Sequence, residues 1–247
     1  MTAQMTSLDA EVMSALSTVV DPELDEPITD LGFVRSIILD DLGVEVHLRL
    51  PTSFCSPNFA YLMASDAMDA LRLMPGGGVV RVMLDDHHDS DKINLGLATD
   101  AGYRGTFGNE AHEDLEELRA TFKRKAHIAS MERSCMQMLQ RGTWTLEELP
   151  LLELRDLPDC AKTKSLVRRR AAIGLPTAPD SRVLVDGDGV AIPERDVPLR
   201  LRMAATTRRS IEGNAHFCRG LLATRYAGSQ EIDAITGPVI TDLRSGA

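Results

Sequence analysis

The sequence has few aromatic residues and no long apolar run. Aromatic residues make up 4% of the 247 residues, which argues against a stacking platform for single-stranded nucleic acid. No stretch of about eighteen uncharged apolar residues is present, and the first ten residues lack the basic and apolar segments of a secretory signal. These absences predict a soluble, cytoplasmic protein that binds neither a membrane nor nucleic acid.

Cysteine is scarce, and its positions follow no regular spacing. Cys55, Cys135, Cys160 and Cys218 include no CxxC pair, so neither a disulfide framework nor a zinc ribbon is indicated. We therefore expect reduced thiols. The role of each thiol has to be argued from its own surroundings.

Basic residues are also scarce, but only in the first half of the chain. Residues 1–110 hold 6 Lys and Arg against 18 Asp and Glu, whereas residues 111–247 hold 21 against 19. The acidic first half repels nucleic acid and anionic membranes, and the second half is nearly balanced. The two halves therefore differ in charge, and protein partners or cationic ligands fit them better than nucleic acid or anionic membranes do.

The first 85 residues predict a small domain with the order α-β-β-α-β. Helical spacing of apolar residues marks the helices, and alternating apolar residues mark the strands. The predicted elements are a helix over 8–20, strands over 33–39 and 44–50, a helix over 58–73 and a strand over 79–84. Such an order is typical of a compact α+β layer.

The remaining residues predict a mainly helical C-terminal region. Residues 86–108 are rich in Gly, His and Asp and are interpreted as a linker or an ordered loop. His87 and His88, amid aspartates, could bind a divalent cation, but such runs are usually solvated, and solvation is expected here. Residues 109–247 are interpreted as a client-binding or partner-binding domain, with its longest helices over 110–141 and 198–226. The predicted fold class is therefore α+β, a small first domain followed by a mainly helical region.

Four short motifs follow one another within the first domain. They are Asp21-Pro22-Glu23, Thr29-Asp30-Leu31-Gly32, Thr52-Ser53-Phe54-Cys55-Ser56-Pro57 and Met74-Pro75-Gly76. In this order the motifs resemble the metal–sulfur cluster biosynthesis family of PaaD and SufT relatives, over residues 8–85. The resemblance implies a non-enzymatic maturation factor for a client metalloprotein, such as a multicomponent monooxygenase. Its cargo would be iron or an iron–sulfur cluster, held transiently.

Cys55 is the residue on which this chemistry would depend. It lies just before the N-terminus of a predicted helix, where the N–H groups and the helix dipole favour the thiolate that ligates iron. The alternative is a small buried hydrophobic residue, as free cysteines often are. The family commonly has Cys directly before Pro, whereas Ser56 intervenes here. This departure supports a second interpretation, a scaffold protein that has lost its metal chemistry.

Neighbouring polar residues are candidates to support Cys55. Thr52 and Ser53 are expected to hydrogen-bond the cysteine sulfur. The resemblance suggests that the loop with Asp21 and Glu23 lies near the cysteine, where a carboxylate orients a metal ligand or holds a partner's lysine. The simpler alternative is that Asp21 forms a turn and Glu23 is solvated.

A single cysteine cannot hold a cluster, because iron–sulfur clusters take about four protein ligands. A homodimer, a partner protein or the helical half has to supply the others. Glu212 and His216 are spaced i, i+4 on a predicted helix with Cys218 just beyond, a donor set suited to iron or zinc. The alternatives are an exposed pair beside a buried cysteine, or a metalloenzyme site. No nucleophile and base stand at motif spacing, so no turnover is expected.

Overall fold

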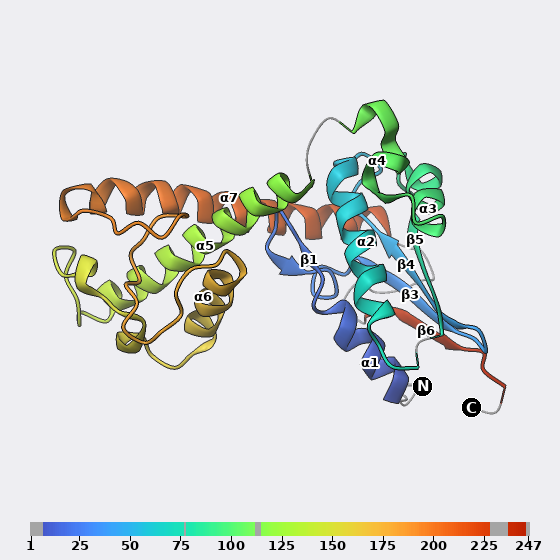
Figure 1. Ribbon diagram of the computed structural model, residues 1–247, viewed down its shortest axis with the longest axis horizontal. Coiled ribbons are helices and arrows are strands. Elements are labelled where there is room, and N and C mark those ends of the chain that lie inside the picture. Colours follow the sequence, from blue (N-terminus) through green and yellow to red (C-terminus); the bar gives the residue numbers. More distant parts are fainter. Residues whose placement is uncertain (1–6, 77, 112–114, 228–236, 246–247) are drawn as a thin grey trace. The chain divides into compact units, whose positions relative to one another are not determined.

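The computed structural model describes residues 7–76, 78–111, 115–227 and 237–245 (Figure 1). The chain forms two compact units, which we name by their architecture. The sheet unit comprises Met1–Leu115 together with Asn214–Ala247, and the helical unit comprises Glu116–Gly213. The sheet unit therefore contains the C-terminal segment, which the sequence analysis assigns to a second domain.

A four-stranded sheet organises the sheet unit. Its strands are, in spatial order, β5 (Val79–Asp85), β4 (Gly43–Arg49), β3 (Val34–Leu39) and β6 (Val239–Asp242). β3 and β4 form an antiparallel pair, whereas β4 with β5 and β3 with β6 pair in parallel. The first three strands confirm the prediction. β6 joins from the C-terminal segment and is not predicted by the sequence.

Two helices complete the predicted order of the first domain. They are α1 (Ser7–Leu16) and α2 (Pro57–Arg72), which pack against one another, and α2 also packs against β5. Val44, Val46 and Leu48 on the core side of β4 are each at most 2% exposed, as the alternating pattern predicts. The α-β-β-α-β order and the α+β fold class are thus confirmed.

The loop between α1 and β3 is long but well bonded. It contains the paired two-residue strands β1 (Val20–Asp21) and β2 (Glu26–Pro27). Gly32, with φ of +74°, then turns the chain into β3, a conformation that glycine adopts without steric cost. The carbonyl of Gly32 accepts a hydrogen bond from Arg49 Nε at 3.2 Å, which ties this loop to the end of β4.

Residues 86–108 are not the linker that their composition suggests. They contain α3 (Ser90–Ala98) and α4 (Gly102–Phe107), followed by a short 3-10 helix over Gly108–Glu110. Ile93, Leu97 and Phe107 are buried in the core of the sheet unit. Their burial stabilises both helices, so the apolar residues outweigh the nearby glycines and aspartates.

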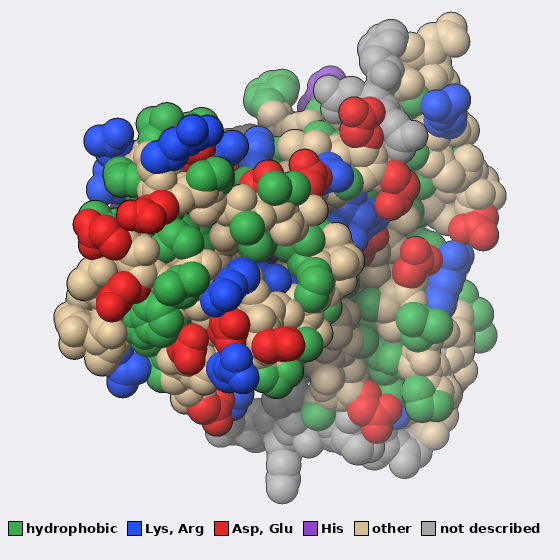
Figure 2. Space-filling model, turned by 60° about the vertical axis from the view of Figure 1, so that its left-hand side comes forward, with side chains coloured by type: hydrophobic (Ala, Val, Ile, Leu, Met, Phe, Trp, Pro, Cys, Tyr) green, Lys and Arg blue, Asp and Glu red, His purple; other side chains and the backbone are tan. Residues whose placement is uncertain are grey.

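The helical unit is built on two further helices. They are α5 (Leu115–Gln140), whose first residue belongs to the sheet unit, and α6 (Ala161–Ala172). Three short 3-10 helices lie over Leu149–Leu151, Leu154–Asp156 and Glu194–Asp196. Residues 112–114 of the predicted long helix lie outside the described residues. Basic and acidic side chains are interspersed over the face shown in Figure 2, in line with the balanced charge of this half.

The last helix, α7 (Val197–Arg225), runs from the helical unit into the sheet unit. Its residues from Asn214 onward contribute Ala215 and Leu222 to the core of the sheet unit. The C-terminal part of α7 therefore helps to build the core against which Cys55 packs.

Within the described parts of the chain, no helix is long and apolar enough to cross a membrane.

Candidate functional site at the Cys55 loop

The loop that carries Cys55 connects β4 to α2. Pro57 is the first residue of α2 and Ser56 occupies the N-cap position, so Cys55 lies two residues before the start of the helix. Proline suits the first turn of a helix because no N–H is needed there. Cys55 is half-buried. A hydrogen bond of 3.4 Å joins its Sγ to Thr52 Oγ1, which is the contact expected from the sequence.

His87 holds the backbone of Cys55 in place. Its Nδ1 accepts the N–H of Asp89 at 3.1 Å, which leaves the ring proton on Nε2 to donate to the carbonyl of Cys55 at 2.8 Å. The next residue, His88, donates its backbone N–H to the carbonyl of Ser53 at 3.0 Å. His87 is 6% exposed, so the expectation that it is solvated is wrong, whereas His88 is exposed as expected.

Parallel pairing of β4 and β5 explains why these histidines meet the cysteine loop. Arg49, the last residue of β4, is in register with Asp85, the last residue of β5. Residues that follow two parallel strands emerge at the same edge of a sheet. The contact of His87 with the Cys55 loop is not predicted from the sequence, although the two predicted strands would have placed it there if their parallel pairing had been recognised.

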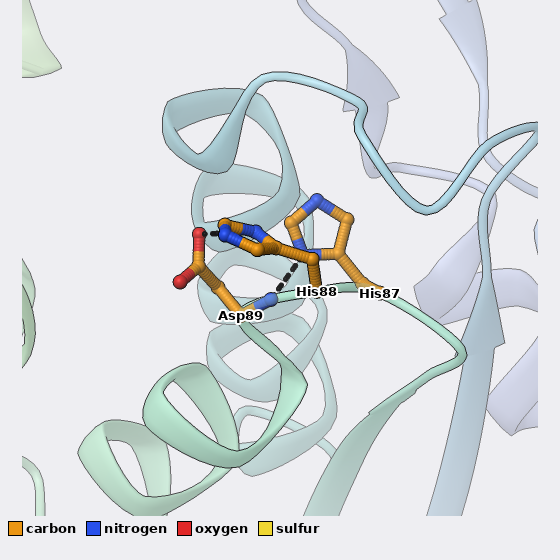
Figure 3. A group of neighbouring side chains, drawn as sticks. All are labelled: His87, His88 and Asp89. Carbon is orange, nitrogen blue, oxygen red and sulfur yellow. Dashed lines mark hydrogen bonds and ion pairs between the residues drawn. The ribbon is translucent and has the colours of Figure 1, made fainter.

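His87, His88 and Asp89 also have ligand atoms within 4.8 Å of one another, the geometry of a metal site (Figure 3). They form the only such group of three or more ligands among the residues that the structure describes. Both ring nitrogens of His87 are already bonded to backbone groups, and His88 Nδ1 lies 3.2 Å from a carboxylate oxygen of Asp89. This group therefore supports the loop and is not our candidate metal site.

Arg225, in the last turn of α7, holds the loop from another side. Its Nη1 donates to the carbonyl of Leu50 at 3.0 Å, and its Nη2 donates to Ser53 Oγ at 2.9 Å and to the carbonyl of Asp86. The hydroxyl of Ser53 thus bonds to a guanidinium, where the sequence analysis expects a bond to the cysteine sulfur. Hydrogen bonds from a charged donor are the stronger kind, so Arg225 fixes the start and the middle of the loop.

Asp21 is a buried carboxylate that closes a turn. It is 6% exposed, and its Oδ1 accepts the N–H groups of Glu23 at 2.9 Å and Leu24 at 2.8 Å. Burial raises the pKa of Asp21 to about 6, a rise that the two backbone hydrogen bonds limit and the nearby carboxylates of Glu23 and Glu26 reinforce. The turn expected as the simpler alternative is thus present, and its carboxyl group titrates near neutral pH.

Glu23 is bonded to α7 and is therefore not simply solvated. Its Oε1 accepts a hydrogen bond from Asn214 Nδ2 at 3.2 Å, and Arg219 forms an ion pair with Glu26 in the same loop. These two bonds attach one turn of α7 to the Asp21–Glu26 loop. Cys218 lies between the two α7 residues that make them.

Cys218 shares the surroundings of the Cys55 loop. Both cysteines are half-buried and pack against the core of the sheet unit. Burial raises the pKa of Cys218 to about 11, and the negative charges of Cys55, Asp21 and Glu23 act in the same direction. Cys218 thus lies within electrostatic range of Cys55, Asp21 and Glu23, although these residues form no group of three or more adjacent ligand atoms in the described part of the chain.

Glu212 and His216 do not join Cys218. Glu212 forms ion pairs with Arg133 at 3.2 Å and with Arg208 at 2.6 Å, all within the helical unit. His216 is exposed, and a separation of two residues turns it roughly 200° around the helix from Cys218. The three residues therefore do not form the metal site that their spacing suggests.

Comparison with known proteins places relatives over the region that contains the Cys55 loop. The model of a family described as iron–sulfur cluster assembly protein matches residues 9–84. The iron–sulfur cluster carrier proteins of Mycobacterium tuberculosis and Mycobacterium leprae are 36% and 34% identical over 89 residues. These matches cover 36% of this chain but only 23% of each carrier protein. No solved structure matches the chain.

An archaeal relative defines the extent of the shared region. An uncharacterized protein of Methanocaldococcus jannaschii is 33% identical over 85 residues, which are 34% of this chain and 87% of that protein. The matched region is thus nearly the whole of that relative. In this chain, the residues that the family model matches, 9–84, run from α1 to β5 and include Cys55. Through residues 9–84, the chain belongs to the family of iron–sulfur cluster assembly proteins.

Proposed function

We propose that this chain holds iron or an iron–sulfur cluster at Cys55 for a short time and passes it to a client metalloprotein, without catalysing a reaction. The observation that carries the proposal is a half-buried thiol in a loop whose backbone is bonded to His87 and Arg225. A loop that is already ordered loses little conformational freedom when a ligand arrives. The carrier proteins among the relatives support the same role.

Transfer to a client requires that the client reach the sulfur. Phe54, directly before Cys55, is 82% exposed, and its ring lies 5.9 Å from that of His88. Exposed aromatic side chains contribute strongly to binding between proteins. Phe54 is therefore well placed to contact the protein that receives the cargo.

The helical unit is our candidate for client recognition. On α7, Leu199 and Met203 are 54% and 56% exposed and stand one helical turn apart, so they present a small apolar surface. The client proposed here is a multicomponent monooxygenase. That choice rests on the resemblance to the PaaD relatives alone.

Anaerobic reconstitution tests the proposed cargo site. The full chain, its Cys55→Ser variant and its Cys160→Ser variant are incubated with ferrous iron and sulfide, then desalted and analysed for iron and visible absorbance. Cys160 is a suitable control because it is another half-buried free cysteine but lies in the helical unit. We expect the Cys160→Ser variant to match the wild type and the Cys55→Ser variant to lose the bound iron. Equal iron in all three proteins would contradict a site at Cys55 and favour a scaffold without metal chemistry.

A further inference from the structure

A second cysteine packs against the same core as Cys55, on a helix outside the region that the family shares. We propose that Cys218 of α7 is a second thiolate ligand for the iron or cluster held at Cys55. This inference rests on the proposed function, because it assumes that the cargo is bound at Cys55. It adds a ligand from outside residues 9–84, the part of the chain that matches the family.

The buried face of α7 orients Cys218 inward. Ala215, Cys218 and Leu222 are spaced three and four residues apart and share one face of the helix. Ala215 is 1% exposed and Leu222 is 2% exposed, and both belong to the core that Cys55 also contacts. A side chain between two buried residues on the same face points toward the same core. Cys218 therefore faces the body of the sheet unit, where its side chain is half-buried.

Bonds on both sides of Cys218 fix its position along the helix. Asn214 and Arg219 attach the helix to Glu23 and Glu26, and two turns later Arg225 bonds to Leu50 and Ser53 in the cysteine loop. These contacts are made to the Asp21–Glu26 loop at one end and to the Cys55 loop at the other. The stretch of helix that contains Cys218 consequently spans the distance between the two loops.

The chemistry of the two thiols, Cys55 and Cys218, suits iron binding better than it suits simple packing. Two thiols provide the soft ligands that iron–sulfur clusters take. Asp21 and Glu23 both lie close enough to act on Cys218 electrostatically. Negative groups gathered around two thiols repel a free thiolate, but they attract a cation. Two thiolates also leave about two cluster ligands to come from elsewhere, which fits a cargo that is shared with a client.

Cobalt(II) is a direct probe of the number of thiolates, because the intensity of its sulfur-to-metal charge-transfer absorbance rises with each thiolate bound. The full-length reduced protein is titrated with cobalt(II) under anaerobic conditions, as wild type and as Cys55→Ser, Cys218→Ser, Cys218→Ala and Cys160→Ser variants. Near-ultraviolet circular dichroism of the tyrosines verifies folding of the sheet unit, because Tyr61, Tyr103 and Tyr226 all lie in it. Iron reconstitution of the same five proteins gives a second reading.

A two-thiolate site gives a distinctive pattern. We expect both Cys218 variants to keep their fold, to show about half the charge-transfer intensity and to bind cobalt at least about tenfold more weakly. The Cys160→Ser variant should match the wild type. Wild-type behaviour of both Cys218 variants, together with loss of binding by Cys55→Ser, would overturn the inference and leave the proposed function standing. Binding that is unchanged in Cys55→Ser, or absent from the wild type, would overturn both.

Discussion

Replacement of Asp21 by asparagine should stabilise the sheet unit at neutral pH. The carboxyl group has a pKa of about 6 in the folded protein and an ordinary pKa of 3.8 in the unfolded chain. The folded state therefore binds the proton more tightly than the unfolded chain does. The stabilisation that this proton gives is complete below pH 3.8 and is lost as the pH rises through 6. At 1.36 kcal/mol per pH unit, the ionised carboxylate costs about 3 kcal/mol at pH 7.

Asparagine removes this charge and keeps the local bonds. Its side-chain oxygen accepts the N–H groups of Glu23 and Leu24 as Asp21 Oδ1 does, so the turn needs no rearrangement. The expected gain in the free energy of unfolding for Asp21→Asn is up to about 3 kcal/mol at pH 7 to 8. The gain should shrink as the pH is lowered and vanish near pH 4, where the wild-type carboxyl group of the folded protein is protonated.

The two units report their unfolding through different chromophores, which makes the assay specific. All three tyrosines lie in the sheet unit, whereas Trp144, the single tryptophan, lies in the helical unit. Denaturant unfolding is followed by tyrosine circular dichroism at pH 4 and pH 8, with Asp30→Asn, which alters an exposed carboxylate near the same loop, as the control. A variant that is no more stable than the wild type at pH 8, or whose gain does not change with pH, would refute the reasoning.

Three further predictions concern single side chains elsewhere in the chain. Burial, helped by the charge of Arg170, lowers the pKa of His127 from 6.5 to about 4. The free energy of unfolding of the helical unit should therefore fall by up to about 3 kcal/mol between pH 6.5 and 4. Denaturant unfolding followed by tryptophan fluorescence measures this loss, which should be absent in the His127→Leu variant. Backbone N–H groups at the start of α6 lower the pKa of Cys160 to about 7, so mass spectrometry should find it alkylated first at pH 7, with the buried Cys135 last. Arg225→Met should cost the sheet unit about 2 kcal/mol in denaturant unfolding and speed the alkylation of Cys55.

The sequence is most informative where local pattern and tertiary packing agree. β4 alternates apolar and polar residues, and the structure buries the apolar ones, so both its type and its packed face are predicted correctly. The prediction for the stretch with α3 and α4 is wrong for the opposite reason, because local pattern and tertiary packing disagree there. Ile93 and Leu97 have the spacing of one helical face, but the surrounding Asp and Gly residues are typical of a loop. Only their burial in an existing core makes these short helices stable.

The candidate site shows the same limit. Thr52 lies three residues from Cys55, and the bond between them follows from the loop alone. His87 and Arg225 reach the same loop only because a parallel strand pair and a distant helix bring them there. Neither contact has a local signal. Their side chains could be assigned to the loop only after the pairing of β4 with β5 and the packing of α7 were known.

Cys218 shows how a helical residue with ligand chemistry should be interpreted. Its spacing from Glu212 and His216 suggests a metal site on one helix. The two nearest apolar positions on its own face, Ala215 and Leu222, are a better indication of the direction in which its side chain points. Apolar neighbours at i−3 and i+4 predict that a cysteine faces a core, whereas an exposed histidine two residues away belongs to another face. A search for the partner of such a cysteine should therefore begin with what the buried face covers. In this chain that reasoning leads from Cys218 to the loop of Cys55.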